Sequence, residues 1–199
     1  MADANNDNNR LINTLQQMNG KTITDKNGRS YTVEIVSPRG LIAKLAAPNR
    51  FTVLVNAPAP LNSPEWKIGF SLGPLHYKYG EKFGKPETVG IFFITNFKTE
   101  WGIDIVDFNP VRGNGLFPAA IKLLRQFTPE GQMFSLNDIK EETTSTALEE
   151  GKDFFKTPLG KAFSIGLWRL VENDDCGYVT LETTGPATYD CVEAMKNKR

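Results

Sequence analysis

The spacing of apolar residues predicts a helix and then several strands in the first part of the chain. Four apolar residues recur at helical spacing over 9–18, and Gly20 then ends the pattern. Two runs rich in β-type residues flank Lys26-Asn27-Gly28, a sequence typical of a hairpin turn. A further strand is predicted at Phe51–Val55, and a proline-rich linker over 57–64 follows it.

From residue 65 onward the pattern predicts strands joined by turns, with one clear amphipathic helix. Apolar runs over 88–97 and 101–108 are typical of strands and are separated by a tight turn. An apolar stripe over 116–127 predicts a helix, and a strand over 132–138 follows. The two strands flanking this helix would be parallel. Further elements are expected as a strand over 65–73, a short strand at Leu75–Tyr79, a helix over 141–150, a hairpin over 163–184 and a last helix over 187–199.

Together these elements predict an α+β fold. It would be a mixed, mostly antiparallel sheet flanked by helices on both faces, with an N-terminal helix and extra strands. Residues 1–8 are rich in Asn and Asp and have no apolar anchor, so a disordered tail is expected. The segment 9–64 would be an elaboration that either extends the sheet on its early-strand side or covers an acceptor site. Residues 65–199 would form the core of what is expected to be one domain overall.

Composition excludes several classes of protein. The 23 Lys and Arg residues balance 23 Asp and Glu residues, so the basic surface of a nucleic-acid binder is not indicated. Hydrophobic residues make up 40% of the chain, which excludes wholesale disorder. Two cysteines and a single histidine, His76, indicate neither a disulfide framework nor a metal site. The first residues have neither the positive start nor the apolar stretch typical of a leader, and no apolar run reaches membrane-spanning length, so a soluble cytoplasmic protein is expected. A phage protein or a secreted effector would show the same pattern.

The junction over 106–127, where a strand gives way to the amphipathic helix, carries the strongest chemical signal. The strand breaks at an Asn-Pro pair, and Arg112, Gly113 and Gly115 follow before the helix. The first N–H groups of a helix lack partners inside it and lie at the positive end of its dipole, so they bind a phosphate well. Glycines let the backbone approach such an anion and adopt positive φ, and an arginine adds a charge-assisted contact. The alternative is a plain strand-to-helix turn with a solvated arginine.

The order of elements and the sequence PVRGNGLFPAAIKLL resemble the GNAT superfamily of N-acetyltransferases over about residues 65–184. The acetyl-CoA motif of that family is Arg or Gln, two residues, Gly, one residue, then Gly or Ala, placed between the fourth strand and the third helix. Arg112 and Gly115 match it, and Gly113 fits its common form. Phe117 stands where the family has a small residue. Pro118 is a second departure, because it removes a backbone donor from the first helical turn.

This resemblance implies an acyl-CoA-dependent acyltransferase, an N-acetyltransferase that moves an acyl group from acetyl-CoA or another acyl-CoA to an amine acceptor. The pyrophosphate would bind at the helix start. The pantetheine arm would pair like a strand with the backbone where the fourth and fifth strands splay apart. The residues implied to bind the cosubstrate are Ile105, Val106, Phe108, Val111, Arg112, Gly113, Asn114, Gly115 and Leu116.

Acyl transfer to an amine needs a base for the ammonium and an acid for the departing thiolate. The resemblance places the base on the fourth strand, where Asp104 and Asp107 are the candidates, with Glu100 at the strand's start. Alternation along this strand predicts that Asp107 shares one face with Ile105 and that Asp104 shares the other with Phe108.

The family often takes its acid from a tyrosine on the fourth helix, and residues 128–177 contain no tyrosine. That gap and the N-terminal elaboration favour a second hypothesis: a non-catalytic interaction protein, of phage or effector type, that uses a related sheet to bind a partner. The Arg-Gly-Asn-Gly junction favours the acyltransferase.

Overall fold

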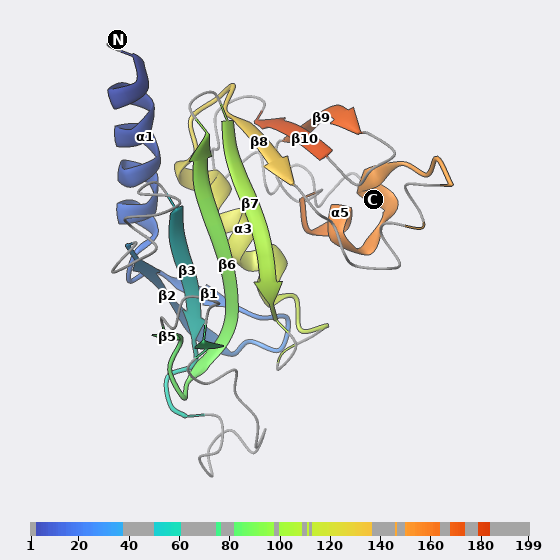
Figure 1. Cartoon of the computed structure of the whole chain (residues 1–199). Helices are drawn as coiled ribbons and strands as arrows, with labels where there is room; N and C mark the ends of the chain where they lie inside the picture. The colour runs from blue at the N-terminus through green and yellow to red at the C-terminus, as the bar shows by residue number, and fades with distance from the viewer. Residues whose placement is uncertain are drawn as a thin grey trace.

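A computed structural model shows one large sheet with helices packed against it (Figure 1). It describes residues 3–37, 50–60, 75–76, 82–97, 100–108, 111, 113–136, 146, 150–163, 168–173 and 179–183. The elements are α1 (Asp3–Met18), β1 (Thr22–Thr24), β2 (Ser30–Val36), β3 (Arg50–Asn56), β4 (Leu75–His76), β5 (Lys82–Phe83), β6 (Thr88–Phe97), β7 (Glu100–Asp107), α3 (Leu116–Phe127), β8 (Met133–Leu136), the short 3-10 helix η2 (Phe154–Lys156), α5 (Pro158–Phe163), β9 (Trp168–Asn173) and β10 (Val179–Thr183).

Eight strands form the large sheet in the order β1-β2-β3-β6-β7-β8-β10-β9, and β4 pairs with β5 separately. All neighbours in the large sheet are antiparallel except β7 and β8, which are parallel. A parallel pair needs a crossover connection, and α3 provides it. The predicted strand–helix–strand unit is therefore confirmed.

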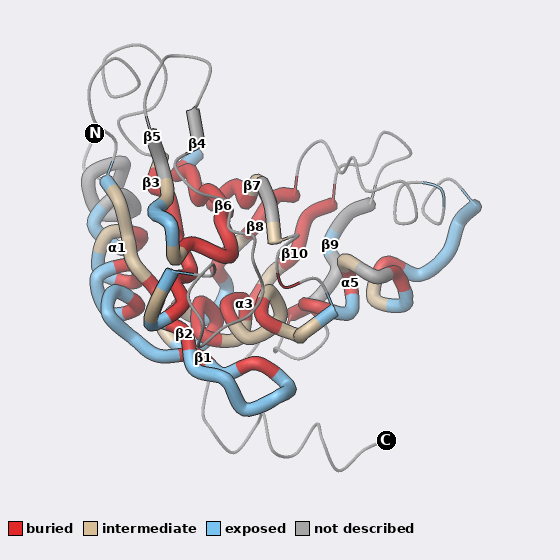
Figure 2. The backbone as a smooth tube through the Cα atoms, turned by 90° about the horizontal axis from the view of Figure 1, so that it is seen from below, coloured by how far each residue is buried: buried red, intermediate tan, exposed pale blue. Residues whose placement is uncertain are grey.

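The described helices α1, α3 and α5 lie together on one face of the sheet (Figure 2). Alternate residues of the central strands face these helices and form one buried core with them, including Phe92, Ile94, Trp101 and Ile103. The predicted stripe of α3 points into this core, where Leu116, Ala120 and Leu124 are at most 1% exposed. The core thus fixes α3 beneath the middle of the sheet.

The α+β class and the mixed, mostly antiparallel sheet are confirmed. Helix α3 and strand β6 have their predicted bounds, and β9 and β10 form the predicted terminal hairpin. The described helices cover one face. The helices expected over 141–150 and 187–199, and the strand expected over 65–73, fall almost entirely outside the described residues.

The N-terminal segment differs from expectation in one respect. Helix α1 begins at Asp3, so residues 3–8 are helical where the sequence predicts a disordered tail. Acidic and amide side chains near a helix start favour the helix through its dipole and its unpaired N–H groups. Strand β3 pairs with β6, so the segment 9–64 extends the sheet on its early-strand side. No helix among the described residues is long and apolar enough to cross a membrane.

Candidate functional site

The loop between β7 and α3 is a tight turn that needs both of its glycines. The N–H of Val111 donates to the carbonyl of Phe108 at 3.1 Å, and the N–H of Asn114 donates to the carbonyl of Val111 at 3.0 Å. Gly113 therefore stands at the third position of a four-residue turn, with φ 78°. Gly115 follows as the N-cap of α3 with φ 76°. The expected positive φ values at the two glycines are confirmed, and other residues would be strained there.

The N-terminus of α3 carries unpaired backbone donors. The first helical bond runs from the N–H of Ala119 to the carbonyl of Gly115 at 3.1 Å. No side chain caps the helix, and its first turn holds no acidic residue. Within the described part of the chain, no acceptor takes the N–H groups of Gly115, Leu116 and Phe117. These donors and the dipole make this end suitable for an anion.

Strand β7 changes its surroundings halfway along its length. Its pairing with β8 runs from Glu100 to Ile103, so the described registers leave the second half of β7 paired only with β6. The β6–β7 register also shifts, because Ile105 lies opposite Phe92 while Asp107 lies opposite Ile91. One extra residue stands between them, which makes a β-bulge at the end of the strand nearest the glycine turn.

The bulge overturns the predicted alternation at the end of β7. Phe108 was expected to share a face with Asp104. It packs instead on the helix-covered side, where its ring lies against Gly90 so closely that a Cβ there would collide with it. Its ring also meets Phe92 at 6.4 Å and Phe117 at 5.2 Å between centroids. In the backbone register, Asp107 lies opposite Ile91, one residue before Phe92 in β6.

Phe117, the departure from the family motif, has a packing role. Besides Phe108, it meets Phe92 edge-on at 6.3 Å and Phe163 of α5 at 6.2 Å between ring centroids. The ring therefore points into the aromatic core. A small residue at this position would lose these contacts.

Asp104, one of the predicted bases, is held in an ion pair. Its Oδ2 lies 3.1 Å from Nη2 of Arg50, and the two side chains are 40% and 26% exposed. The guanidinium also lies 4.3 Å from the centre of the Phe93 ring. The guanidinium stabilises the charged carboxylate, which makes Asp104 a weaker base than a carboxylate without such a partner.

The other predicted site residues lie at different distances from the turn. Glu100 is the first residue of β7 and Asp107 the last, so the rise of a strand separates them by about 23 Å. Asp107 thus lies at the glycine turn and Glu100 at the opposite end of the sheet. Ile105 and Val106 belong to the half of β7 that pairs only with β6 in the described registers, and Arg112 lies outside the described residues.

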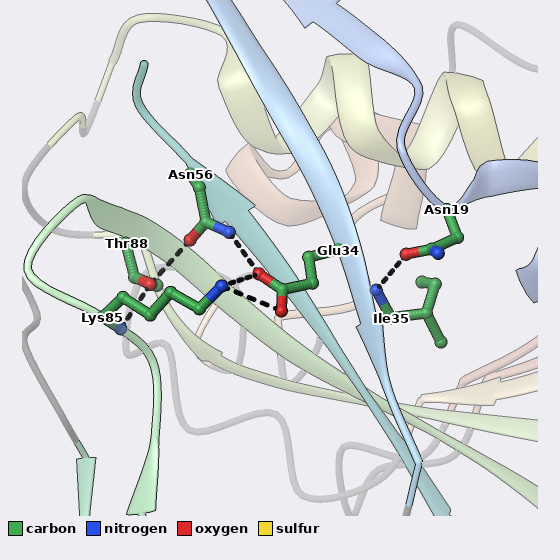
Figure 3. Close-up of polar contacts among 6 residues, drawn as sticks. All are labelled: Asn19, Glu34, Ile35, Asn56, Lys85 and Thr88. Carbon is green, nitrogen blue, oxygen red and sulfur yellow. Dashed lines mark hydrogen bonds and ion pairs between the residues drawn. The ribbon is translucent and has the colours of Figure 1, made fainter. Parts of the chain in front are cut away.

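A polar network that the sequence did not reveal closes the same end of the sheet (Figure 3). The carboxylate of Glu34 accepts from Nζ of Lys85 at 2.8 and 3.0 Å and from Nδ2 of Asn56 at 2.8 Å. The Thr88 hydroxyl donates to Oδ1 of Asn56 at 2.7 Å and accepts from the N–H of Lys85 at 2.7 Å. The bond to Glu34 raises the pKa of the Lys85 ammonium. The network fixes the start of β6, beside the Gly90–Phe108 contact.

No group of three or more His, Cys, Asp or Glu side chains suited to a metal occurs among the described residues. This end of the sheet presents backbone donors, carboxylates and aromatic rings.

The chain is similar in fold to two solved structures. A protein of unknown function from Aquifex aeolicus VF5 aligns with a TM-score of 0.46 and 10% identity, over 92% of this chain and 87% of that one. A mutant of a cAMP-binding acyltransferase from Mycobacterium smegmatis aligns with a TM-score of 0.43 and 8% identity, over 98% of this chain and 57% of that one. No family model and no curated protein matches the sequence. These likenesses concern the fold and do not bear on activity.

Proposed function

We propose that this protein binds an acyl-CoA at the junction of β7 and α3 and transfers its acyl group to an amine. The observation that carries the proposal is the uncapped N-terminus of α3, which two positive-φ glycines precede and in whose first turn no acidic residue lies. Glycine is an accepted N-cap residue, but unlike Ser, Thr, Asp or Asn it brings no side-chain oxygen to accept from the first N–H groups of the helix. Bare donors suit the diphosphate of a CoA ester instead.

The second half of β7 supports the binding of an extended arm beside this diphosphate. In the described registers, residues after Ile103 have no partner on the β8 side, so an extended ligand could bond to their backbone groups. The pantetheine arm would follow Ile105, Val106 and Phe108. Its aliphatic carbons would lie near the aromatic pair of Phe108 and Phe117.

The chemistry would be acyl transfer between sulfur and nitrogen. A base takes a proton from the substrate ammonium, the amine nitrogen attacks the thioester carbonyl carbon, and the C–S bond breaks to release the thiolate, which is then protonated. We assign the base to Asp107 or Asp104. Glu100 ranks last because it lies at the far end of β7. Asp104 would act with Arg50 still bonded to its Oδ2.

Calorimetric titration of the wild type with acetyl-CoA and with free CoA tests the proposal. Both ligands should bind the wild type. Arg112→Ala should raise the Kd by roughly 10- to 150-fold, because it removes the free energy of one charge-assisted hydrogen bond. Its Tm should change little. Asp107→Asn, Asp104→Asn and Glu100→Gln then identify the base, as the variant that loses acyl transfer but keeps its Kd for acetyl-CoA. If neither ligand binds at millimolar concentration, the acyltransferase proposal fails.

A non-catalytic binding protein is the second candidate function, and the ion pair between Arg50 and Asp104 favours it. A carboxylate that already has a guanidinium partner is suited to structure more than to proton transfer. In this case the protein would release no thiol from acetyl-CoA with any amine tested, and the three carboxylate variants would all behave as the wild type.

A further inference from the structure

The tip of the β1–β2 hairpin lies against the glycine turn that precedes α3. The backbone N–H of Lys26 donates to the carbonyl oxygen of Asn114 at 2.9 Å. A Cβ placed on Gly115 would lie 3.9 Å from the Cβ of Lys26, which is ordinary van der Waals contact. Two segments far apart in the sequence therefore meet at the candidate site.

One buried carboxylate makes this hairpin tip rigid. Asp25 is 6% exposed. Its Oδ1 accepts from the N–H groups of Asn27 at 2.8 Å and Arg29 at 3.0 Å, and its Oδ2 accepts from the Tyr31 hydroxyl at 3.0 Å. The N–H of Gly28, at φ 81°, closes the turn on the Asp25 carbonyl at 3.1 Å. A tip with this many bonds can act as a fixed support for whatever it touches.

The contact with Asn114 determines where a neighbouring donor points. The carbonyl of Asn114 and the N–H of Gly115 belong to one planar trans peptide, in which the two groups point in opposite directions. By holding the carbonyl, the N–H of Lys26 fixes the direction of the Gly115 N–H. That N–H is the first of the donors at the start of α3 for which the described residues supply no acceptor.

We propose that the β1–β2 hairpin is a brace that aims the backbone donors at the start of α3, and that Lys26 is a positioning residue for the ligand bound there. The identity of the ligand depends on the proposed function, whereas the existence of the brace does not. Without the bond from Lys26, the peptide between Asn114 and Gly115 can rotate, because glycine tolerates many backbone angles. Donors already fixed in direction bind an anion more tightly than donors that must be ordered.

Two substitutions at one position separate the brace from simple charge. Lys26→Pro removes the N–H that bonds to Asn114, and Lys26 is the second residue of the turn from Asp25 to Gly28, where the fixed φ of proline is tolerated. Lys26→Ala keeps the N–H and removes only the ammonium, so it is the matched control. Gly28→Ala is a second test variant, because it strains the same tip at positive φ without changing Lys26.

Hydrogen exchange of the amides of Asn114 and Ala119, which are bonded to the carbonyls of Val111 and Gly115, is measured first, without ligand. Exchange should become roughly 2- to 12-fold faster in Lys26→Pro, because this variant loses the free energy of one hydrogen bond. It should also become faster in Gly28→Ala and stay unchanged in Lys26→Ala. The Kd for acetyl-CoA should rise by a similar factor in Lys26→Pro and should not rise in Lys26→Ala. The Tm of both variants should change little.

Unchanged exchange in both Lys26→Pro and Gly28→Ala would overturn the brace. So would equal losses of affinity in Lys26→Pro and Lys26→Ala, since these would assign the effect to the ammonium. If the wild type binds neither acetyl-CoA nor CoA, the proposed function fails, and the exchange rates still decide whether the brace exists.

Discussion

The two ends of helix α3 are built in opposite ways. At the C-terminal end, the N–H of Thr128 donates to the carbonyls of Leu124 and Arg125 at 3.1 and 3.3 Å, and its hydroxyl donates to Leu124 at 2.8 Å. Arg125 is 3% exposed, and its Nη1 donates to the carbonyl of Thr128 at 3.2 Å. The hydroxyl of Thr14 in α1 donates to the carbonyl of Phe127 at 3.1 Å. This end has its carbonyls bonded and a positive charge at the negative end of the dipole.

The N-terminal end has neither a side-chain cap nor a compensating charge in its first turn. Relative to a Ser, Thr or Asp cap, the glycine at this N-cap costs only about a few tenths of a kcal/mol of stability, but it brings no side-chain acceptor. The same helix thus has one end suited to folding and one end whose donors are left for something else. One end of α3 has its backbone groups bonded and the other end has no side-chain cap, so a binding role is the first explanation to test for the uncapped end.

Breaking the N-terminal end should have the largest effect. Gly115→Val places a β-branched side chain at φ 76°, on the side of the hairpin residue Lys26, so the strained turn should shift the helix donors and acetyl-CoA binding should be abolished. The backbone strain should also lower stability by about 1–2 kcal/mol. Gly20→Val is the matched control, because Gly20 also has φ 76° and lies away from the turn with nothing near its Cβ position. It should lose similar stability and keep binding, as measured by calorimetry and thermal melting. Wild-type affinity in Gly115→Val would place the ligand elsewhere.

Breaking the C-terminal end should act on stability alone. Arg125→Met keeps much of the buried volume but removes the charged donor to Thr128, so the free energy of unfolding should fall by about 1.5–3 kcal/mol. For a chain of this size the Tm would drop by roughly 3–12 °C. Titration of the folded variant with acetyl-CoA should give the wild-type Kd. A weaker Kd without loss of Tm would contradict the division between the two ends.

The hairpin that supports the N-terminal end should weaken at high pH. Burial and the neighbouring Asp25 carboxylate raise the pKa of Tyr31 to about 12, from an ordinary value of 10. Between these two pH values the folded protein keeps a proton that the unfolded chain has lost, so the free energy of unfolding falls as the pH rises through this window. The loss is at most on the order of 2 kcal/mol. Urea unfolding at pH 10 and pH 12 should show a smaller fall for Tyr31→Phe, and parallel falls would exclude the tyrosine as the cause.

Adding charge to the bare end should give the smallest effect, with opposite signs for folding and binding. Pro118→Glu places a carboxylate in the first turn of α3, and Pro118→Gln is its uncharged control. The Glu variant should be more stable than the Gln variant by about 0.3–1 kcal/mol, because the helix dipole favours the negative charge there. It should bind acetyl-CoA more weakly, since the carboxylate repels the diphosphate. Equal affinities of the two variants would contradict an anion site at this end.

The features that the sequence predicted depend only on residues close together in the chain. The stripe of α3 and the apolar run of β6 each carry their own periodicity, so their bounds could be derived without any knowledge of neighbours. The positive φ of Gly113 and Gly115 could likewise be expected, because few other residues serve in such a turn.

The remaining features depend on pairs that no local pattern records. Arg50 reaches Asp104 across the intervening strand β6, and nothing near Asp104 in the sequence announces that partner. The bulge before Asp107 reverses an alternation that the residue types alone support. The bond from Lys26 to Asn114 joins two backbone groups, so it leaves no signature in residue identity.

The bond between Thr14 and Phe127 spans 113 residues of sequence, and this distance has a consequence for synthesis. At about 5–20 residues per second, the ribosome makes α1 roughly 6–23 s before it completes the helix on which α1 packs. During that interval the buried side of α1, with Leu11, Leu15 and Met18, has no α3 to cover it. The nascent chain therefore exposes this apolar face early. We expect the hairpin and the first strands to cover part of it before the crossover helix arrives.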